Sequence, residues 1–171
     1  MPTKQQTLID TLSEEDKKKI GITSDDLKYS IGSVHRIKMT EKDGITLIEK
    51  EDINRGYRFK RVVIVAEKDG VNYATTLINS EPNVNYISKE NIKKDCHPIY
   101  RRDYPFIEIN KSPSFVDCGI LFTFKKERLI QENDHLGYLN ASDCDIILNK
   151  IKNSDRIDII NLIEFGFIEN Y

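Results

Sequence analysis

The chain has 171 residues, of which 39% are hydrophobic and 32% are charged, and its formal net charge at pH 7 is −2. This length fits one domain, and this composition is typical of a soluble globular protein with a well-solvated surface. The balance of 26 basic against 28 acidic residues is unlike that of a protein that coats nucleic acid through bulk charge. A local basic site could still bind phosphate, so the total charge does not decide about RNA.

Apolar runs and cysteines indicate a cytoplasmic protein without membrane contact. The longest unbroken apolar run, Val62–Ala66, is far shorter than the roughly 20 residues of a membrane helix. The N-terminal segment lacks the continuous apolar core of a secretory signal. Cys96, Cys118 and Cys144 are irregularly spaced and form no CxxC pair, which predicts reduced thiols. The histidines do not cluster with them, so we expect neither a metal nor a cofactor. The adjacent pair Cys96 and His97 could act in catalysis only if the fold supplied a base.

Residues 1–31 are predicted to form a helical extension before the main domain, which we place at residues 32–171. An apolar stripe predicts helix within residues 4–29, and Ser13 followed by Asp16 is typical of a capping arrangement. Gly32 is expected to end this unit.

A β-rich region follows. The alternation of apolar and polar residues over Ser33–Met39 predicts a half-buried strand. A turn is expected at residues 42–44, and residues 45–52 are interpreted as a strand or loop. The dipeptide Asp69-Gly70 separates the β-type runs Arg61–Glu67 and Val71–Ile78. It predicts a β-hairpin with a type I′ turn, which needs positive φ at both central residues.

The second half is predicted to contain a loop, two strands and two helices. We expect a long surface loop over residues 81–98, then strands at 104–109 and 114–124, with Ile120, Phe122 and Phe124 sharing one face. A helix is expected to begin at Asn140 or Ser142 and to bury Ile146, Ile147 and Ile151, and a second helix spans about 155–165 and ends at Gly166. This order predicts a mainly β fold, a small barrel or bent sheet with helices at one side.

A basic and aromatic cluster is the main candidate site. The sequence RGYRFKR, from Arg55 to Arg61, contains arginines that can bind phosphate and two aromatic rings that can stack on bases. The alternative interpretation is a solvated loop that leads into a strand. Walker, GxGxxG, HExxH and GxSxG patterns are absent from the sequence, so the enzyme classes that rely on them lose their usual support.

Four blocks in order resemble the PemK/MazF family of toxin ribonucleases over residues 33–152: FKRVVIVA, TLINSE, SFVDCGILFTFKKERL and GYLNASDCDIILNKI. The resemblance implies an SH3-like barrel that forms a homodimer, works in the cytoplasm and is inhibited by an antitoxin protein. It also implies cleavage of single-stranded RNA without metal, by attack of a ribose 2′-OH on the adjacent phosphate. The products would be a 2′,3′-cyclic phosphate and a free 5′-OH.

The family's functional residues are carried over by position. Arg61 matches the arginine that stabilises phosphate charge and assists proton transfer, and Asn79 and Ser80 match the Thr-Ser pair that holds the phosphate. Arg55 and Arg58 are expected to support the substrate, as is Asp117, a shifted substitute for an acidic residue. The chain departs from the family pattern in three places. Val62 stands where the family has proline, the late strand lacks the family's polar and basic residues, and residues 1–31 have no counterpart.

Two other hypotheses remain open. The chain could be an SH3-like binding module that lost catalysis, or a sheet protein of unrelated ancestry. The nuclease hypothesis requires Arg61 and Ser80 to face one exposed cleft; burial or wide separation of either would favour a binding module.

Overall fold

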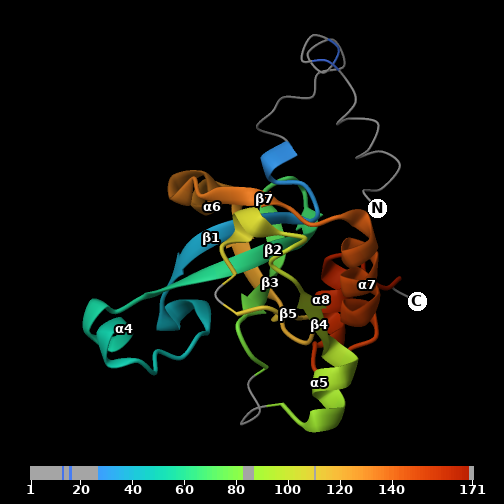
Figure 1. Cartoon of the computed structure of the whole chain (residues 1–171). Helices are drawn as coiled ribbons and strands as arrows, with labels where there is room; N and C mark the ends of the chain where they lie inside the picture. Colours follow the sequence, from blue (N-terminus) through green and yellow to red (C-terminus); the bar gives the residue numbers. More distant parts are fainter. Residues whose placement is uncertain (1–12, 14–15, 17–26, 83–86, 110, 170–171) are drawn as a thin grey trace.

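The fold is a curled antiparallel sheet surrounded by helices (Figure 1). The computed structural model describes Ser13, Asp16 and residues 27–82, 87–109 and 111–169. The strand order is β4-β5-β3-β2-β1-β7, and β6 also pairs with β3, so the sheet curls into a half-barrel. Its strands are β1 (Ser33–Met39), β2 (Arg58–Lys68), β3 (Asn72–Asn79), β4 (Cys96–Ile99), β5 (Ser114–Asp117), β6 (Phe122–Lys125) and β7 (His135–Tyr138).

The helices are short and lie mainly between strands or after the sheet. They are α4 (Lys50–Arg55), α5 (Lys89–Asp95), α6 (Lys126–Glu132), α7 (Ala141–Lys152) and α8 (Ile159–Glu164), with 3₁₀ turns η1 (Glu41–Asp43) and η2 (Pro105–Ile107). Within the described residues, no helix combines the length and apolarity needed to cross a bilayer.

The central hairpin is confirmed. Asp69 and Gly70 have φ of 57° and 67°, and the Val71 N–H donates to the Lys68 carbonyl at 3.2 Å, as a type I′ turn requires. The strand β1 is also confirmed and pairs with β2 over six residues on each strand. The hairpin and β1 therefore form a three-stranded frame on which the rest of the sheet is built.

The sheet curls because two separate strands share one edge of β3. Residues Asn72–Thr75 pair with β6, and residues Ile78 and Asn79 pair with β5. The prediction of one strand over 114–124 is therefore wrong, because the chain turns between β5 and β6. Gly119 lies in this turn, where a Cβ atom would collide with the Arg156 guanidinium. Phe122 and Phe124 are buried as predicted, but Ile120, in the turn, is 37% exposed.

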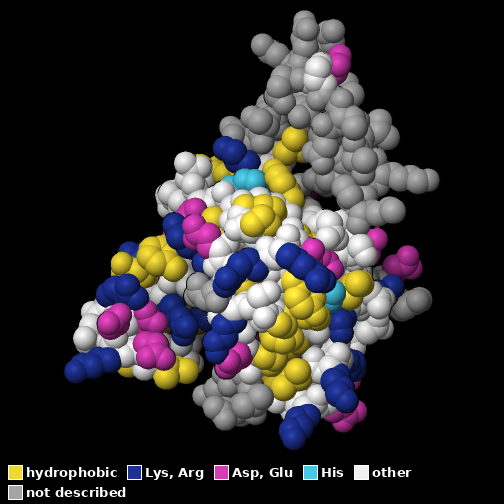
Figure 2. Space-filling model, in the orientation of Figure 1, with side chains coloured by type: hydrophobic (Ala, Val, Ile, Leu, Met, Phe, Trp, Pro, Cys, Tyr) yellow, Lys and Arg dark blue, Asp and Glu magenta, His cyan; other side chains and the backbone are white. Residues whose placement is uncertain are grey.

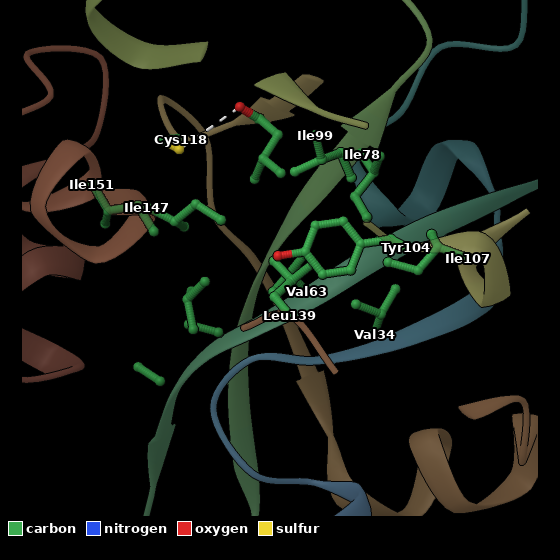
Figure 3. Close-up of a cluster of buried hydrophobic side chains, with 14 of the residues drawn as sticks. Val34, Val63, Ile78, Ile99, Tyr104, Ile107, Cys118, Leu139, Ile147 and Ile151 are labelled. Carbon is green, nitrogen blue, oxygen red and sulfur yellow. Dashed lines mark hydrogen bonds between the residues drawn. The ribbon is translucent and has the colours of Figure 1, made fainter. Parts of the chain in front are cut away.

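Two apolar clusters occupy the two faces of the sheet. The larger joins Val34, Val63 and Ile78 on the strands to Ile107 in η2 and to Ile147 on α7 (Figure 3). The smaller contains nine residues on the opposite face and next to α6: Ile37, Met39, Val62, Ile64, Tyr73, Leu77, Phe122, Phe124 and Leu129. Each face of the sheet thus carries a buried apolar cluster.

The C-terminal helices agree with the prediction in position. Asn140 is the N-cap of α7, and its Oδ1 accepts the Asp143 N–H at 2.9 Å. Ile147 and Ile151 are buried, whereas Ile146 is 41% exposed. The helix α8 is shorter than predicted and is followed by Gly166 at φ 71°. These helices cover the larger apolar cluster.

Three other predictions are wrong in part. The segment 81–98 contains α5 and β4 instead of a continuous loop, because Ser88 caps α5 by accepting the Asn91 N–H at 3.2 Å. The segment 104–109 holds the turn η2 with Pro105 at its start, and Glu108 adopts a left-handed φ of 54°, so it cannot be a strand. The segment 45–52 runs into α4.

The predicted helical extension lies largely outside the described residues. The Asp16 N–H does donate to the Ser13 Oγ at 3.2 Å, as the capping prediction requires. Gly32 has φ of 91° and directly precedes β1.

Candidate functional site

The strands β1 and β2 form a ribbon whose two faces differ in character. Because side chains alternate along a strand, Arg36 and Lys38 share a face with Phe59 and Arg61, which pair with them across the ribbon. We call this the cationic face. Figure 2 shows Lys and Arg side chains interleaved with hydrophobic ones over the region where Figure 1 labels β1, β2 and α4.

Two arginines lie directly opposite each other on the cationic face. Arg36 pairs with Arg61, and the Arg36 N–H donates at 2.9 Å to the Asp134 carbonyl, away from β2. The arginine pair is therefore of the non-hydrogen-bonded kind, in which Cα atoms are about 4.5 Å apart and side chains are closest. Like charges in this position destabilise a sheet unless anions balance them.

Acceptors from two loops hold the arginines in place. The Arg61 Nε donates to the Ile107 carbonyl at 2.6 Å, and the Arg36 Nε donates to the Asp134 carboxylate at 2.7 Å. A third group, the Glu108 Oε2, lies 3.8 Å from the Arg61 Nη2 and 3.7 Å from the Arg36 Nη1. One exposed carboxylate thus lies between two guanidinium groups without a close hydrogen bond to either.

The pKa of Arg61 is affected by its burial and by the neighbouring charges of Glu108 and Arg36. Burial lowers the pKa of the Arg61 guanidinium, the Glu108 carboxylate raises it, and the Arg36 charge lowers it again. The side chain keeps 22% of its surface exposed. A guanidinium is protonated throughout the physiological range, so Arg61 presents a fixed positive charge at a partly desolvated position.

Aromatic rings continue the cationic face toward α4. The Arg36 guanidinium lies 5.6 Å from the Phe59 ring centroid, and the Lys38 ammonium lies 3.9 Å from the Tyr57 centroid. The Arg55 guanidinium carbon lies 5.4 Å from the Tyr57 ring centroid. The Tyr57 ring packs edge-on against the Phe59 ring, with 5.5 Å between the two centroids. Cation–π contacts of this kind order the rings, and Phe59 remains 49% exposed. Positively charged side chains and aromatic rings therefore lie next to one another along the cationic face.

The structure places two of the three predicted catalytic residues, Arg61 and Asn79, on opposite faces of the sheet. Asn79 lies on the opposite face from Arg61, because its Oδ1 is 3.4 Å from the Nζ of Lys60, the neighbour of Arg61 on β2. Ser80 is exposed and follows the end of β3, at the end of the hairpin where Arg61 pairs with Ile78. Arg61 and Asn79 do not approach a common patch of solvent.

Arg55 and Arg58 converge on a different acid. Both pair with the buried Asp52 carboxylate of α4, Arg58 through its Nε at 3.5 Å. Arg58 and Lys60 lie on the face opposite Arg61, where burial and the Arg58 charge lower the pKa of Lys60 to about 8. These cations stabilise the base of the α4 segment.

Asp117 is held inside the molecule. Its carboxylate accepts from the Arg156 Nη1 at 2.9 Å, and Asp95, fully buried, lies 3.3 Å from the same nitrogen. Asp117 is 8% exposed and lies in β5, outside the cationic face.

The pair Cys96 and His97 is engaged in the fold. Burial raises the pKa of the Cys96 thiol to about 11, so it is a neutral thiol at physiological pH. The His97 Nε2 lies 2.8 Å from the Asp143 Oδ1, and the Tyr104 hydroxyl donates to the other oxygen of that carboxylate. In the ranges that the structure describes, no three His, Cys, Asp or Glu side chains are grouped to hold a metal ion.

Two residues of the cationic face were missed from the sequence. Arg36 was visible as an outward position of the first strand, but its pairing with Arg61 is a long-range contact. Glu108 was assigned to a strand, although Pro105 three residues earlier favours a turn. A scan against protein-family models finds no match for the chain, and a search of curated proteins also finds none.

Proposed function

We propose that this protein binds single-stranded RNA along the cationic face and grips one phosphodiester between Arg36 and Arg61. The supporting observation is the cross-strand guanidinium pair, whose shared carboxylate lies 3.7 and 3.8 Å away. Two guanidinium groups on one face can donate several hydrogen bonds to phosphate oxygens. An exposed carboxylate at ion-pair distance is readily displaced by a phosphate.

The aromatic residues beside the arginines favour a single strand as the ligand. Phe59 is 49% exposed and Tyr57 packs against it, so both lie where unpaired bases could stack. Stacking of a base on an aromatic ring contributes about 1–3 kcal/mol and tolerates any sequence. Duplex RNA hides its base faces and gains nothing from such rings.

The chemistry we propose is cleavage without metal, by attack of a ribose 2′-OH on the adjacent phosphate. The pentavalent transition state gathers negative charge, and a preorganised donor there contributes about 10²–10³ in rate. Arg36 and Arg61, each anchored by a separate acceptor, fit this role. Here Arg36 replaces Asn79 as the partner of Arg61, and Ser80 remains a candidate phosphate contact.

The resemblance to PemK/MazF toxins extends this proposal. It suggests that the half-barrel is a variant of the SH3-like barrel, that two copies form a homodimer in the cytoplasm, and that an antitoxin segment covers the RNA site. An acidic, extended peptide has the charge to neutralise Arg36 and Arg61, and such segments are commonly disordered when free.

A second candidate is a binding module that no longer cleaves. The observation that favours it is the commitment of the Arg61 Nε to the Ile107 carbonyl at 2.6 Å, together with the placement of Asn79 on the other face. Such a module would use the same cationic face and bind the same class of strand.

The two candidates are separated by incubating the purified protein with single-stranded RNA of randomised sequence in excess chelator. We expect products with 2′,3′-cyclic phosphate ends, and an Arg61→Ala variant slower by about 10²–10³-fold. Lys152→Ala removes an exposed cation at the end of α7 and should leave the rate unchanged. Binding without cleavage supports the module. The absence of both binding and cleavage would contradict the proposal.

A further inference from the structure

We propose that Glu108 is the general base of this site and accepts the proton of the attacking 2′-OH. This inference rests on the proposed RNA cleavage and adds a catalytic residue to it. The three groups that carry it are the Glu108 carboxylate and the two guanidinium groups on either side of it.

Glu108 is presented to solvent by a rigid support. Its neighbour Ile107 is fully buried, donates its N–H to the Tyr104 carbonyl at 3.2 Å, and accepts the Arg61 Nε through its own carbonyl. Glu108 itself has φ 54° and ψ 48°, a left-handed conformation that is unfavourable for a residue with a side chain. The fold thus holds the carboxylate next to Arg61 at some cost in stability.

The contacts of Glu108 are weaker than those of a structural ion pair. Charge-assisted N–H···O bonds are about 2.7–2.9 Å long, whereas the two distances here are 3.7 and 3.8 Å. The side chain is 64% exposed, and exposed ion pairs contribute little to stability. The carboxylate can therefore move by a short distance and take a proton without loss of the fold.

The arginines do not need Glu108 to stay in place. Arg36 is anchored by Asp134 at 2.7 Å and Arg61 by the Ile107 carbonyl at 2.6 Å, in each case through Nε. Their remaining N–H groups are available for a phosphate. When a phosphodiester enters between them, its negative charge takes over the balancing role of the carboxylate, and Glu108 is left beside the ribose.

Other candidate bases fit less well. Asp134 already accepts the Arg36 Nε at 2.7 Å, so protonation would remove the anchor of that arginine. Lys60, whose pKa is lowered to about 8, lies on the opposite face of β2. Among the described residues of the cationic face, Glu108 combines exposure with closeness to both arginines.

The step balances without a further reactant. The 2′-OH gives its proton to Glu108 while its oxygen forms a bond to phosphorus. The bond between phosphorus and the 5′-oxygen breaks, and that oxygen takes a proton from water. Glu108 then returns its proton to solvent, which leaves a 2′,3′-cyclic phosphate and a 5′-OH end.

The test compares Glu108→Gln and Glu108→Asp with wild type on single-stranded RNA of randomised sequence. Removal of a general base should slow cleavage by about 10²–10⁴-fold in Glu108→Gln. Aspartate keeps a carboxylate and tolerates the left-handed conformation, so we expect Glu108→Asp to retain more activity than Glu108→Gln. Glu164→Gln removes a surface carboxylate paired with Lys68 and is the matched control.

One further readout separates a base from a structural or binding residue. Binding of a 2′-O-methyl RNA, which cannot be cleaved, should be as tight or tighter in Glu108→Gln, because a negative charge has left the site.

The outcomes are distinct. If wild type cleaves and Glu108→Gln cleaves equally fast, or loses cleavage only in proportion to lost binding, the role of Glu108 is overturned and the proposed function stands. If wild type binds single-stranded RNA without cleaving it, the role of Glu108 is overturned and the binding module is supported. If wild type neither binds nor cleaves single-stranded RNA, the proposed function and this inference both fail.

Discussion

Two charge clusters in this protein have opposite compositions and opposite surroundings. In the first, one carboxylate, Glu108, lies between Arg36 and Arg61 at 3.7 and 3.8 Å and is 64% exposed. In the second, one guanidinium, Arg156, lies between Asp117 and Asp95 at 2.9 and 3.3 Å, and the Asp95 side chain is fully buried.

The difference shows which cluster supports the fold and which is available to a ligand. Buried charges lose their hydration, so they must be paired closely or they destabilise the native state. Exposed charges keep water as an alternative partner, so a loose contact costs little and can be exchanged for a phosphate. Asp117, a predicted substrate residue, belongs to the buried cluster around Arg156, and Arg61 belongs to the exposed cluster around Glu108.

Arg156→Ala tests the comparison most severely, because it would leave two carboxylates in the interior without their cation. We expect it to lower the free energy of unfolding by about 3–5 kcal/mol, as measured by urea denaturation. Arg36→Ala removes an arginine from the exposed cluster and should cost less than about 1 kcal/mol. If the two variants are equally stable, the distinction between the clusters is wrong.

A third test uses the buried His35, with which no carboxylate of the described residues forms an ion pair. Burial lowers the pKa of His35 to about 4, and His35 donates from Nε2 to the Lys28 carbonyl at 2.7 Å; the charges of His135 and Asp134 act on it more weakly. The unfolded chain binds the His35 proton more readily than the folded chain does. The contribution of neutral His35 to the free energy of unfolding is therefore fully present above about pH 6.5 and is lost as the pH falls toward 4.

The expected loss is about 3 kcal/mol of unfolding free energy over that range. His35→Phe keeps a ring against Tyr29, which stacks on His35 at 5.6 Å, and removes the titration. Urea denaturation at several pH values should show a smaller loss on acidification in the variant. Parallel losses in both proteins would mean that His35 does not titrate in this way.

Local sequence signals predicted part of the fold. The Asp69-Gly70 turn and the Asn140 cap are set by residues next to each other in the chain, and both were read correctly. The strand β4 has only four residues and gains its place by pairing with β5, which no local pattern reveals. The break between β5 and β6 depends on Arg156, 37 residues beyond Gly119 in the sequence.

The candidate site was predictable only in its chemistry. Arginines and aromatic residues between Arg55 and Arg61 pointed to phosphate and bases, and Arg61 lies at the observed site. The face on which each residue lies follows from strand register, and a shift by one residue moves a side chain to the other face. The resemblance to the PemK/MazF family groups Asn79 with Arg61 by position in the sequence and gives no role to Arg36, whereas the register places Asn79 on the other face and Arg36 opposite Arg61.

The most direct measurement is the salt dependence of binding between a single-stranded 2′-O-methyl RNA and wild type, the double variant Arg36→Ala/Arg61→Ala, or the control Lys89→Ala/Lys152→Ala. Each phosphate contact on a single strand contributes about 0.7 to the slope of log K against log salt. Because Arg36 and Arg61 hold the same phosphate, we expect the magnitude of the slope to fall by about 0.7 in the arginine variant and to be unchanged in the control. Equal slopes for wild type and the arginine variant would contradict a phosphate site at Arg36 and Arg61.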